Sequence, residues 1–222
     1  MLGHAHPAIL RAVADQAGTG LLHRGPHFQS PVQVALMERL ANVLPPELCV
    51  LHPVTNGTEA TEVEIKAVVH ATGRNRFLAF SGSYHGRSLG DLALSHERGA
   101  NSGVALPPNV GTRIRAPFHL LTDTIDILPD PDGPVSTDTA LTAAAALLEQ
   151  RAAEDDLPAL VLVEAVQAVS GLIGPDTSFL RGLSARCHHH DVPSRWMKSG
   201  PASGAPGAGS ASIMPGSALI WW

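Results

Sequence analysis

The stretch Ala159-Leu160-Val161-Leu162-Val163-Glu164 decides the fold of this chain of 222 residues. A continuous apolar run that ends in a carboxylate is typical of a strand buried on both faces. The alanine-rich segment before it, Asp138–Arg151, predicts a helix, and Ser178–His188 after it predicts another. A buried strand that is flanked in the sequence by helices indicates an α/β arrangement.

The same alternation of strand and helix extends toward the N-terminus. Apolar strands are expected over Arg76–Phe80 and Cys49–Val54, and a helix over about Thr58–Thr72 separates them. The chain is therefore predicted to form an α/β fold with a largely parallel sheet and flanking helices. Two earlier helices are expected, one over Pro7–Ala17 and one that Ser30 caps, with Val32, Leu36, Leu40 and Val43 on one face.

The composition excludes several classes of protein. Fifteen basic residues against twenty acidic ones give a net charge of −5, which argues against a nucleic-acid-binding surface. No apolar run approaches the roughly 18 residues that a membrane span requires, and no signal peptide is visible at the start. Two cysteines, Cys49 and Cys187, cannot build a disulfide framework. We expect a cytoplasmic globular protein without a membrane or nucleic-acid partner.

The last 29 residues, Ser194–Trp222, differ in composition from the rest. They contain no acidic residue, and 19 of them are Gly, Ala, Ser or Pro. A flexible linker is the plain interpretation, and it predicts no packed element there. The strand Ala159–Glu164 would then keep an unpaired edge. We divide the chain into an N-terminal helical segment (1–45), an α/β domain (46–193) and an irregular tail (194–222).

A turn that could bind an anion follows the strand Cys49–Val54. In Thr55-Asn56-Gly57-Thr58-Glu59-Ala60, the glycine lets the backbone approach a ligand, and the helix start offers unpaired N–H groups. Thr58 adds a hydroxyl, so a bound phosphate is one interpretation. A simple N-cap turn is the alternative, and the local sequence alone favours it.

Further polar residues follow the other strands. Tyr84 and His85 lie in the glycine-hinged segment Ser81–Arg87 after Arg76–Phe80, and Glu164 ends its own strand. The carboxyl ends of strands are where α/β proteins place ligand contacts, so Tyr84 could stack on a planar ring and His85 could donate to it. Taken singly, a packed loop explains Tyr84 and His85 better than a ligand site does, and an acid at the position of Glu164 is often a cap for the next helix.

The run Cys187-His188-His189-His190-Asp191 contains residue types that bind metals. Consecutive side chains point in different directions, whereas a zinc site needs ligands that converge. A solvated helix end is therefore the favoured interpretation, and we expect no metal site.

The order of the motifs is more specific than any one of them. Over about Leu2–Pro193 the chain resembles the class III aminotransferases, the pyridoxal-phosphate enzymes that include the acetylornithine, ornithine and 4-aminobutyrate transaminases. The resemblance implies fold type I, a homodimer, and transfer of an amino group from an amino acid or amine to a 2-oxo acid. It is carried by Gly3-His4-Ala5-His6-Pro7, Thr55–Ala60, Ala71-Thr72-Gly73-Arg74, Tyr84-His85-Gly86-Arg87-Ser88-Leu89-Gly90 and Val163-Glu164-Ala165-Val166-Gln167.

The resemblance also implies roles for particular residues. Gly57 and Thr58 would contact the phosphate of pyridoxal 5'-phosphate. Tyr84 would stack on the pyridine ring with His85 beside it, and Glu164 would face the active site as its catalytic carboxylate. Residues 46–193 would then be part of the cofactor-binding large domain.

The chain departs from the family's pattern in ways that predict weakened or lost cofactor binding. It lacks the serine that usually stands between the asparagine and the glycine of the phosphate turn, and Ala165 replaces a proline. No counterpart of the pyridine-pairing aspartate or of the Schiff-base lysine follows Pro193. The only lysines, Lys66 and Lys198, match neither context. We expect an inactive chain; the alternative is a non-catalytic fragment or pseudogene product, at most a weak cofactor binder or subunit partner.

The codons of the tail suggest why these landmarks are missing. Trp196-Met197-Lys198 must be encoded by TGG-ATG-AAR, and regrouping from the last base of the first codon forces Asp-Glu, which valine can follow. Asp-Glu-Val is the family's expected segment. The sequence therefore predicts an aminotransferase that is truncated and frameshifted after Pro193.

Overall fold

A five-stranded sheet is the centre of the fold in the computed structural model, which describes residues 4–20, 28–44, 51–96, 124–129, 136–167, 174–198, 212–213 and 219–221. Its strand order is β3-β2-β4-β5-β6. The first four strands are parallel to their neighbours and β6 is antiparallel to β5, which confirms the predicted α/β class. The strands are β2 (Arg76–Phe80), β3 (Ile125–Leu128), β4 (Pro158–Val166), β5 (Ser194–Lys198) and β6 (Ser212–Ile213).

The stretch that decided the fold lies in the middle of this sheet. β4 pairs with β2 on one side and with β5 on the other, and Pro158–Glu164 is buried throughout. Side chains of β4 alternate between the faces: Val161 and Val163 join one apolar cluster, and Leu160 and Leu162 join the other. An uninterrupted apolar run is the sequence signature of such two-sided burial.

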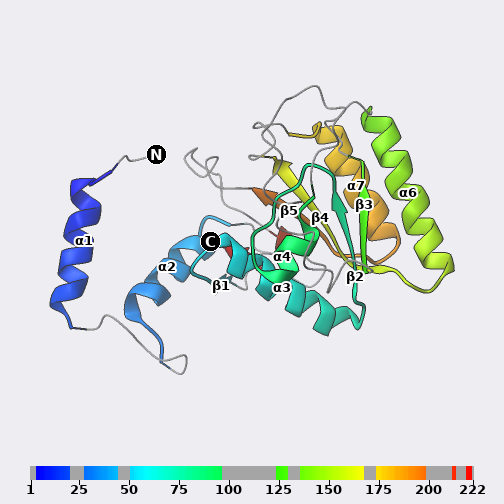
Figure 1. The fold of residues 1–222 in the computed structure, drawn as a ribbon. Helices are drawn as coiled ribbons and strands as arrows, with labels where there is room; N and C mark the ends of the chain where they lie inside the picture. Colours follow the sequence, from blue (N-terminus) through cyan, green and yellow to red (C-terminus); the bar gives the residue numbers. More distant parts are fainter. Residues whose placement is uncertain are drawn as a thin grey trace.

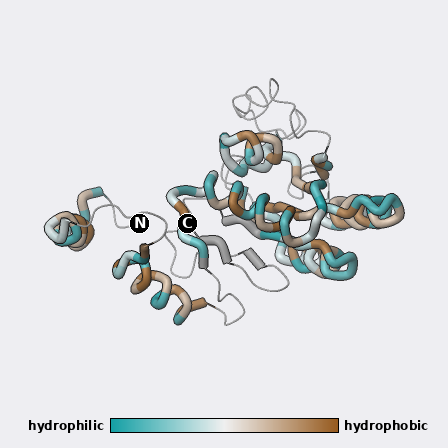
Figure 2. The backbone as a smooth tube through the Cα atoms, turned by 90° about the horizontal axis from the view of Figure 1, so that it is seen from below, coloured by the Kyte–Doolittle hydropathy of each residue, from teal (hydrophilic) through white to brown (hydrophobic). Residues whose placement is uncertain are grey.

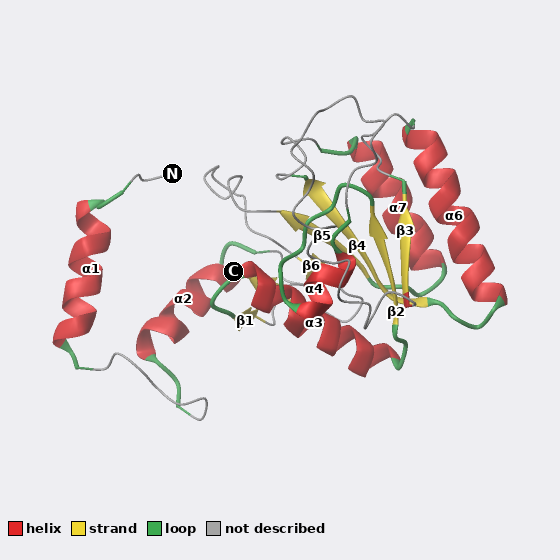
Figure 3. Cartoon of the chain, viewed as in Figure 1, coloured by secondary structure: helices red, strands yellow, loops and turns green. Residues whose placement is uncertain are grey.

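Helices cover both faces of the sheet. α6 (Thr137–Ala153) and α7 (Thr177–His189) pack on one face, where Phe80 meets Phe179 edge-to-face at 5.6 Å, and α3 (Gly57–Thr72) and α4 (Leu89–Leu94) pack on the other (Figure 1, Figure 3). The three long helices confirm the predicted ones to within a few residues. Of the expected strand Cys49–Val54, the structure describes β1 (Leu51–Pro53), which pairs with β7 (Leu219–Trp221).

Two predicted helices lie apart from this body. α1 (Pro7–Gly18) and α2 (Pro31–Ala41) have the expected bounds, and they stand beside the sheet rather than on it (Figure 1, Figure 2). α1 has no buried residue. Of the apolar face predicted for the second helix, Leu40 is buried, whereas Val32, Leu36 and Val43 are exposed. No helix in the described parts of the chain is long and apolar enough to cross a membrane.

The expectation that Ser194–Trp222 forms no packed element is wrong for Ser194–Lys198. These residues form β5 beside β4, in a register that sets Arg195 opposite Leu162. Arg195 is 1% exposed and pairs with Glu64 of α3. The predicted unpaired edge of Ala159–Glu164 is therefore wrong as well. The physical reason is that unpaired backbone groups of β4 can pair with any extended segment that follows α7, whatever its side chains.

Candidate active site

The helix start after β1 is capped by its own side chains. Asn56 is the N-cap of α3, and its Oδ1 accepts a hydrogen bond from the Glu59 amide at 2.9 Å. The Glu59 carboxylate accepts from the Thr55 hydroxyl and amide, both at 2.7 Å, and these bonds hold its pKa below the usual value. The N-cap turn that we weighed against a phosphate site is thus present. It leaves the amides of Gly57 and Thr58 unused by any hydrogen bond in the described part of the chain.

The loop after β2 is joined to the end of β4. The Tyr84 amide donates to Glu164 Oε2 at 2.9 Å, and Glu164 is 1% exposed. Gln167 strengthens this junction, because its Nε2 donates to the Ser81 carbonyl at 3.1 Å. The sequence placed Tyr84 and Glu164 at the carboxyl ends of two strands, and these strands are neighbours in the sheet. The two residues therefore meet, as sites at such strand ends require.

His85 is enclosed between three elements. Its amide donates to the Ser95 hydroxyl at 2.9 Å, and its carbonyl accepts from Thr61 of α3 at 3.4 Å. Its side chain is 2% exposed, and burial lowers its pKa to about 3. The imidazole is therefore neutral at physiological pH, so it can donate one N–H but contributes no positive charge.

Asp91 on α4 is a site residue that our sequence reasoning missed. It is fully buried, and neither carboxylate oxygen has a hydrogen-bond partner of ordinary geometry among the described residues. Burial raises its pKa to about 7, and the hydroxyls of Ser88 and Thr58 partly oppose this by favouring the ionised form. A single acid inside the apolar segment Leu89–Leu94 was the signal that could have revealed it.

These contacts form one continuous site. Thr58 lies beside Asp91, Thr61 reaches the loop at His85, and the same loop contacts Glu164 through Tyr84. All five predicted site residues thus belong to elements that meet at this end of the sheet. Their predicted contacts with a cofactor stay predictions. Cys187 is buried in the core, where burial raises the pKa of its thiol to about 12.

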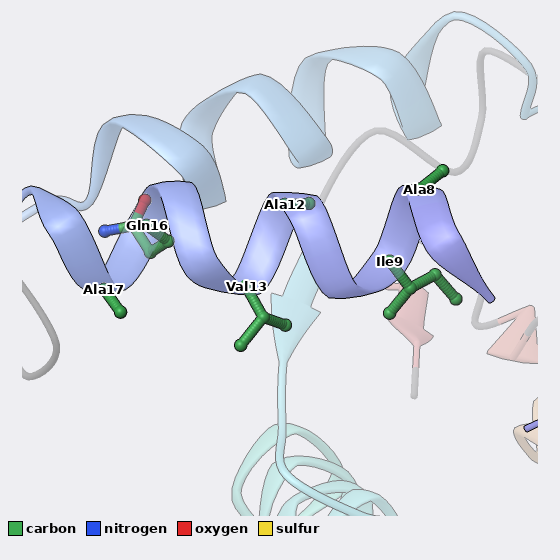
Figure 4. Close-up of a pocket in the computed structure, with 6 residues that line it drawn as sticks. All are labelled: Ala8, Ile9, Ala12, Val13, Gln16 and Ala17. Carbon is green, nitrogen blue, oxygen red and sulfur yellow. The ribbon is translucent and has the colours of Figure 1, made fainter. Parts of the chain in front are cut away.

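A shallow hollow on α1 belongs to a different part of the molecule. Its lining is apolar apart from one glutamine, and no strand end contributes to it (Figure 4). One glutamine is the single polar side chain of this lining, which therefore contains no titratable group for catalysis. The lining residues are Ala8, Ile9, Ala12, Val13, Gln16 and Ala17.

Comparison with known proteins gives consistent matches. A family model described as "Aminotransferase class-III" matches residues 1–193. Glutamate-1-semialdehyde 2,1-aminomutase from Chloroflexus aggregans is 35% identical over 194 residues, which is 86% of this chain and 38% of that protein. Acetylornithine aminotransferase from Methanopyrus kandleri is 30% identical over 192 residues, which is 86% of this chain and 42% of that protein.

Solved structures have the same fold. Taurine:2-oxoglutarate aminotransferase from Bifidobacterium kashiwanohense, in complex with PLP and glutamate, matches with a TM-score of 0.67 at 22% identity, over 88% of this chain and 43% of that one. The chain thus spans about two fifths of the length of the relatives that it matches.

Proposed function

The chain belongs to the class III aminotransferase family, and from this premise we propose that residues 46–193 hold pyridoxal phosphate in an enzyme that transfers an amino group. The donor would be an amino acid or amine and the acceptor a 2-oxo acid. The fold is that of the fold type I pyridoxal-phosphate transferases. We place the activity in the cytoplasm, because two cysteines cannot form the disulfide framework that is common in exported proteins.

The residues at the site fit the cofactor. Gly57 and Thr58 offer two unused amides at the start of a 16-residue helix, where its dipole favours an anion such as a phosphate. Thr58 adds a hydroxyl, and Gly57 has no side chain to obstruct a close approach. Tyr84 is half-buried and has an aromatic face that can stack on a planar ring. When bound, the pyridine ring of the cofactor supplies an electron sink for the substrate.

Glu164 has two tasks in this proposal. One carboxylate oxygen holds the Tyr84 backbone, so the tyrosine ring keeps a defined position above the strand ends. The carboxylate also faces the site, as the resemblance implies. The neutral imidazole of His85 contributes one N–H beside the ring without changing the local charge. The contact between Tyr84 and Glu164 is the single observation that carries the proposal, because it joins two predicted site residues across neighbouring strands.

A binding titration tests this proposal. Equilibrium dialysis of pyridoxal phosphate should give a dissociation constant that rises about tenfold or more in Tyr84→Ala, because stacking is lost. Tyr84→Phe is the matched control, and it should bind almost as the wild type does because it keeps the aromatic face. Equal affinities for the wild type and the alanine variant would contradict the assignment.

We also propose that the 222-residue chain alone has no transaminase activity. Lys66 is exposed on α3, and Lys198 ends β5, so neither follows the family's context for the Schiff-base lysine. Borohydride reduction with the cofactor should therefore leave no specific adduct. An adduct at either lysine that accompanied turnover would contradict this. The alternative role is a non-catalytic cofactor binder or a partner of an intact subunit.

The reading frame after Pro193 belongs to the same proposal. The family match ends at residue 193, where the composition also changes, and this supports a shifted frame over 194–222. Sequencing the coding DNA around Pro193 tests it. A confirmed sequence that encodes Ser194–Trp222 with no aminotransferase frame overlapping it would contradict the shift.

An intramolecular transfer is the second candidate reaction. The 35% identity to a glutamate-1-semialdehyde 2,1-aminomutase favours it, whereas the acetylornithine aminotransferase at 30% identity favours transfer between two substrates. Assays of a frame-restored protein with a 2-oxo acid present or absent distinguish them, because an aminomutase needs no acceptor.

We propose a homodimer as the assembled form. The apolar side chains of α1 support this, since Ile9, Leu10 and Val13 are each at least half exposed. A surface of this kind is typical of a segment that packs against a second chain.

A further inference from the structure

Asp91 is a buried acidic residue that the proposed reaction does not use. It lies on α4 and is fully buried, and its carboxylate oxygens lack hydrogen bonds of ordinary geometry from the described residues. An ionised carboxylate in such surroundings is costly to maintain, so packing alone does not account for it.

Asp91 faces the start of α3. The Thr58 hydroxyl lies beside its carboxylate. On the other side is Gly86, where an added Cβ would stand only 2.1 Å from the carboxylate oxygen Oδ2. Gly86 also has a φ of +145°, which side-chain-bearing residues rarely adopt. The carboxylate therefore lies between the loop after β2 and the side chain of Thr58, one of the two residues assigned to the phosphate.

We propose that Asp91 controls the anion affinity of the α3 start: its protonated form admits a dianion beside Thr58, and its ionised form repels it. This inference rests on the proposed phosphate role of Gly57 and Thr58. Burial raises the pKa of Asp91 to about 7, so both forms are populated near neutral pH. Anion binding should consequently weaken as the pH rises through neutrality.

The charged groups around Asp91 agree with this assignment. Glu62 of α3 accepts hydrogen bonds from the Ser88 hydroxyl and the Gly90 amide, and its negative charge favours the protonated form of Asp91. His85 in the preceding loop is neutral, and α4 contains no other charged residue. Arg87 of the loop is exposed, and Arg76 of β2 pairs with Asp126 and Asp156.

His52 is another ionisable group near the start of α3. It precedes α3, and its charge acts on Glu59 in the first turn of that helix. A positive charge on His52 would also favour an anion at this helix start. A test must therefore separate the two residues.

Sulfate is a suitable probe because it stays doubly charged throughout the neutral range. Its binding to the full chain can be followed through the amide resonances of Gly57 and Thr58. With Asp91 titrating at about 7, the protonated fraction falls about tenfold between about pH 6 and about pH 8, so the apparent dissociation constant should rise about tenfold. Asp91→Asn should abolish this rise and bind at the higher pH as tightly as the wild type does at the lower one.

His52→Gln is the matched control, and it should keep the tenfold rise. A rise that persists in Asp91→Asn, or one that disappears in His52→Gln, would overturn the inference. A wild type whose sulfate affinity does not change with pH would overturn the Asp91 assignment alone. Sulfate that leaves both amide resonances unmoved would instead contradict the phosphate role of Gly57 and Thr58.

A direct measurement on the wild type keeps the inference testable if the variant does not fold. The carboxyl carbon resonance of Asp91 reports its titration. Sulfate at about ten times the dissociation constant of the protonated form should raise the midpoint by about one pH unit, because linkage is reciprocal. An unchanged midpoint at that sulfate concentration would refute the coupling.

Discussion

The α/β body and the N-terminal arm, by which we mean α1 with α2, contain similarly apolar helices that differ in what covers them. In the body, Ala144 and Leu148 of α6 are fully buried, and even Glu64 of α3 is 1% exposed. In the arm, Ile9 is 50% and Val13 63% exposed. Figure 2 shows apolar segments in both regions. The spacing of apolar residues therefore indicates which face of a helix is apolar, but it does not indicate which surface covers that face.

The largest effect is expected when a buried charge in the body loses its partner. Glu64→Ala would remove the partner of the buried Arg195, whose pKa burial already lowers to about 10. We expect a loss of about 3–5 kcal/mol in the free energy of unfolding, because an unpaired buried charge remains. Urea denaturation measures it.

The double variant Glu64→Leu with Arg195→Leu is the control. It should lose much less stability, since no buried charge is left without a partner. A single-variant loss below about 1 kcal/mol would mean that water reaches the pair.

The same substitution in both regions gives the next largest effect. Leu160→Ala should destabilise the body by about 3 kcal/mol, because it leaves a cavity between β4 and the α3 layer. Leu10→Ala, at a position 55% exposed on α1, should change the free energy of unfolding by less than about 0.5 kcal/mol. Urea denaturation of both variants and of the wild type at low protein concentration measures the two losses in the free energy of unfolding. Equal losses would mean that α1 is covered by the rest of its own chain.

The pH dependence of the free energy of unfolding tests whether the carboxyl group of Asp91 is buried in the body. Asp91 has a pKa of about 7 in the folded chain, against an ordinary value of 3.8 for an aspartate in the unfolded chain, so between these values the unfolded chain loses its proton first. The wild type should therefore lose stability as the pH rises through this window. Asp91→Asn should not show this loss of stability, because asparagine does not titrate.

The measured quantity is the free energy of unfolding of Asp91→Asn minus that of the wild type. It should grow by about 2 kcal/mol between about pH 5 and about pH 7 and then stay constant. The subtraction cancels other groups, including His85, whose lowered pKa makes both proteins less stable as the pH falls below its ordinary value. A difference that does not vary with pH would show that Asp91 is solvated.

The smallest effect on stability is expected in the arm. Val13→Asp should change the free energy of unfolding of the dilute chain by less than about 0.5 kcal/mol, because the position is exposed. In the proposed homodimer the same charge would be buried, so dimer dissociation should increase about tenfold or more. Light scattering over a concentration series measures this, with Arg11→Gln as a control for a charge change on α1. An undisturbed dimer would show that α1 lies outside the interface.

The sequence by itself determined the elements and much of the site. The apolar run of β4, Ser30 before α2 and the alanine-rich stretch of α6 are local signals, so they predicted bounds to within a few residues. Polar residues at the carboxyl ends of predicted strands identified Tyr84 and Glu164. These inferences succeeded because each depends on neighbours in the chain.

Only the tertiary structure decided which distant residues share an environment. Glu64 and Arg195 are 131 positions apart, and their buried contact includes a residue of β5, a strand in a segment that the sequence had indicated as an irregular tail. Asp91 acquires its raised pKa only from enclosure by elements that come together in the fold. Burial, pairing and the covering of an apolar face depend on such long-range contacts, and local periodicity contains no information about the partner.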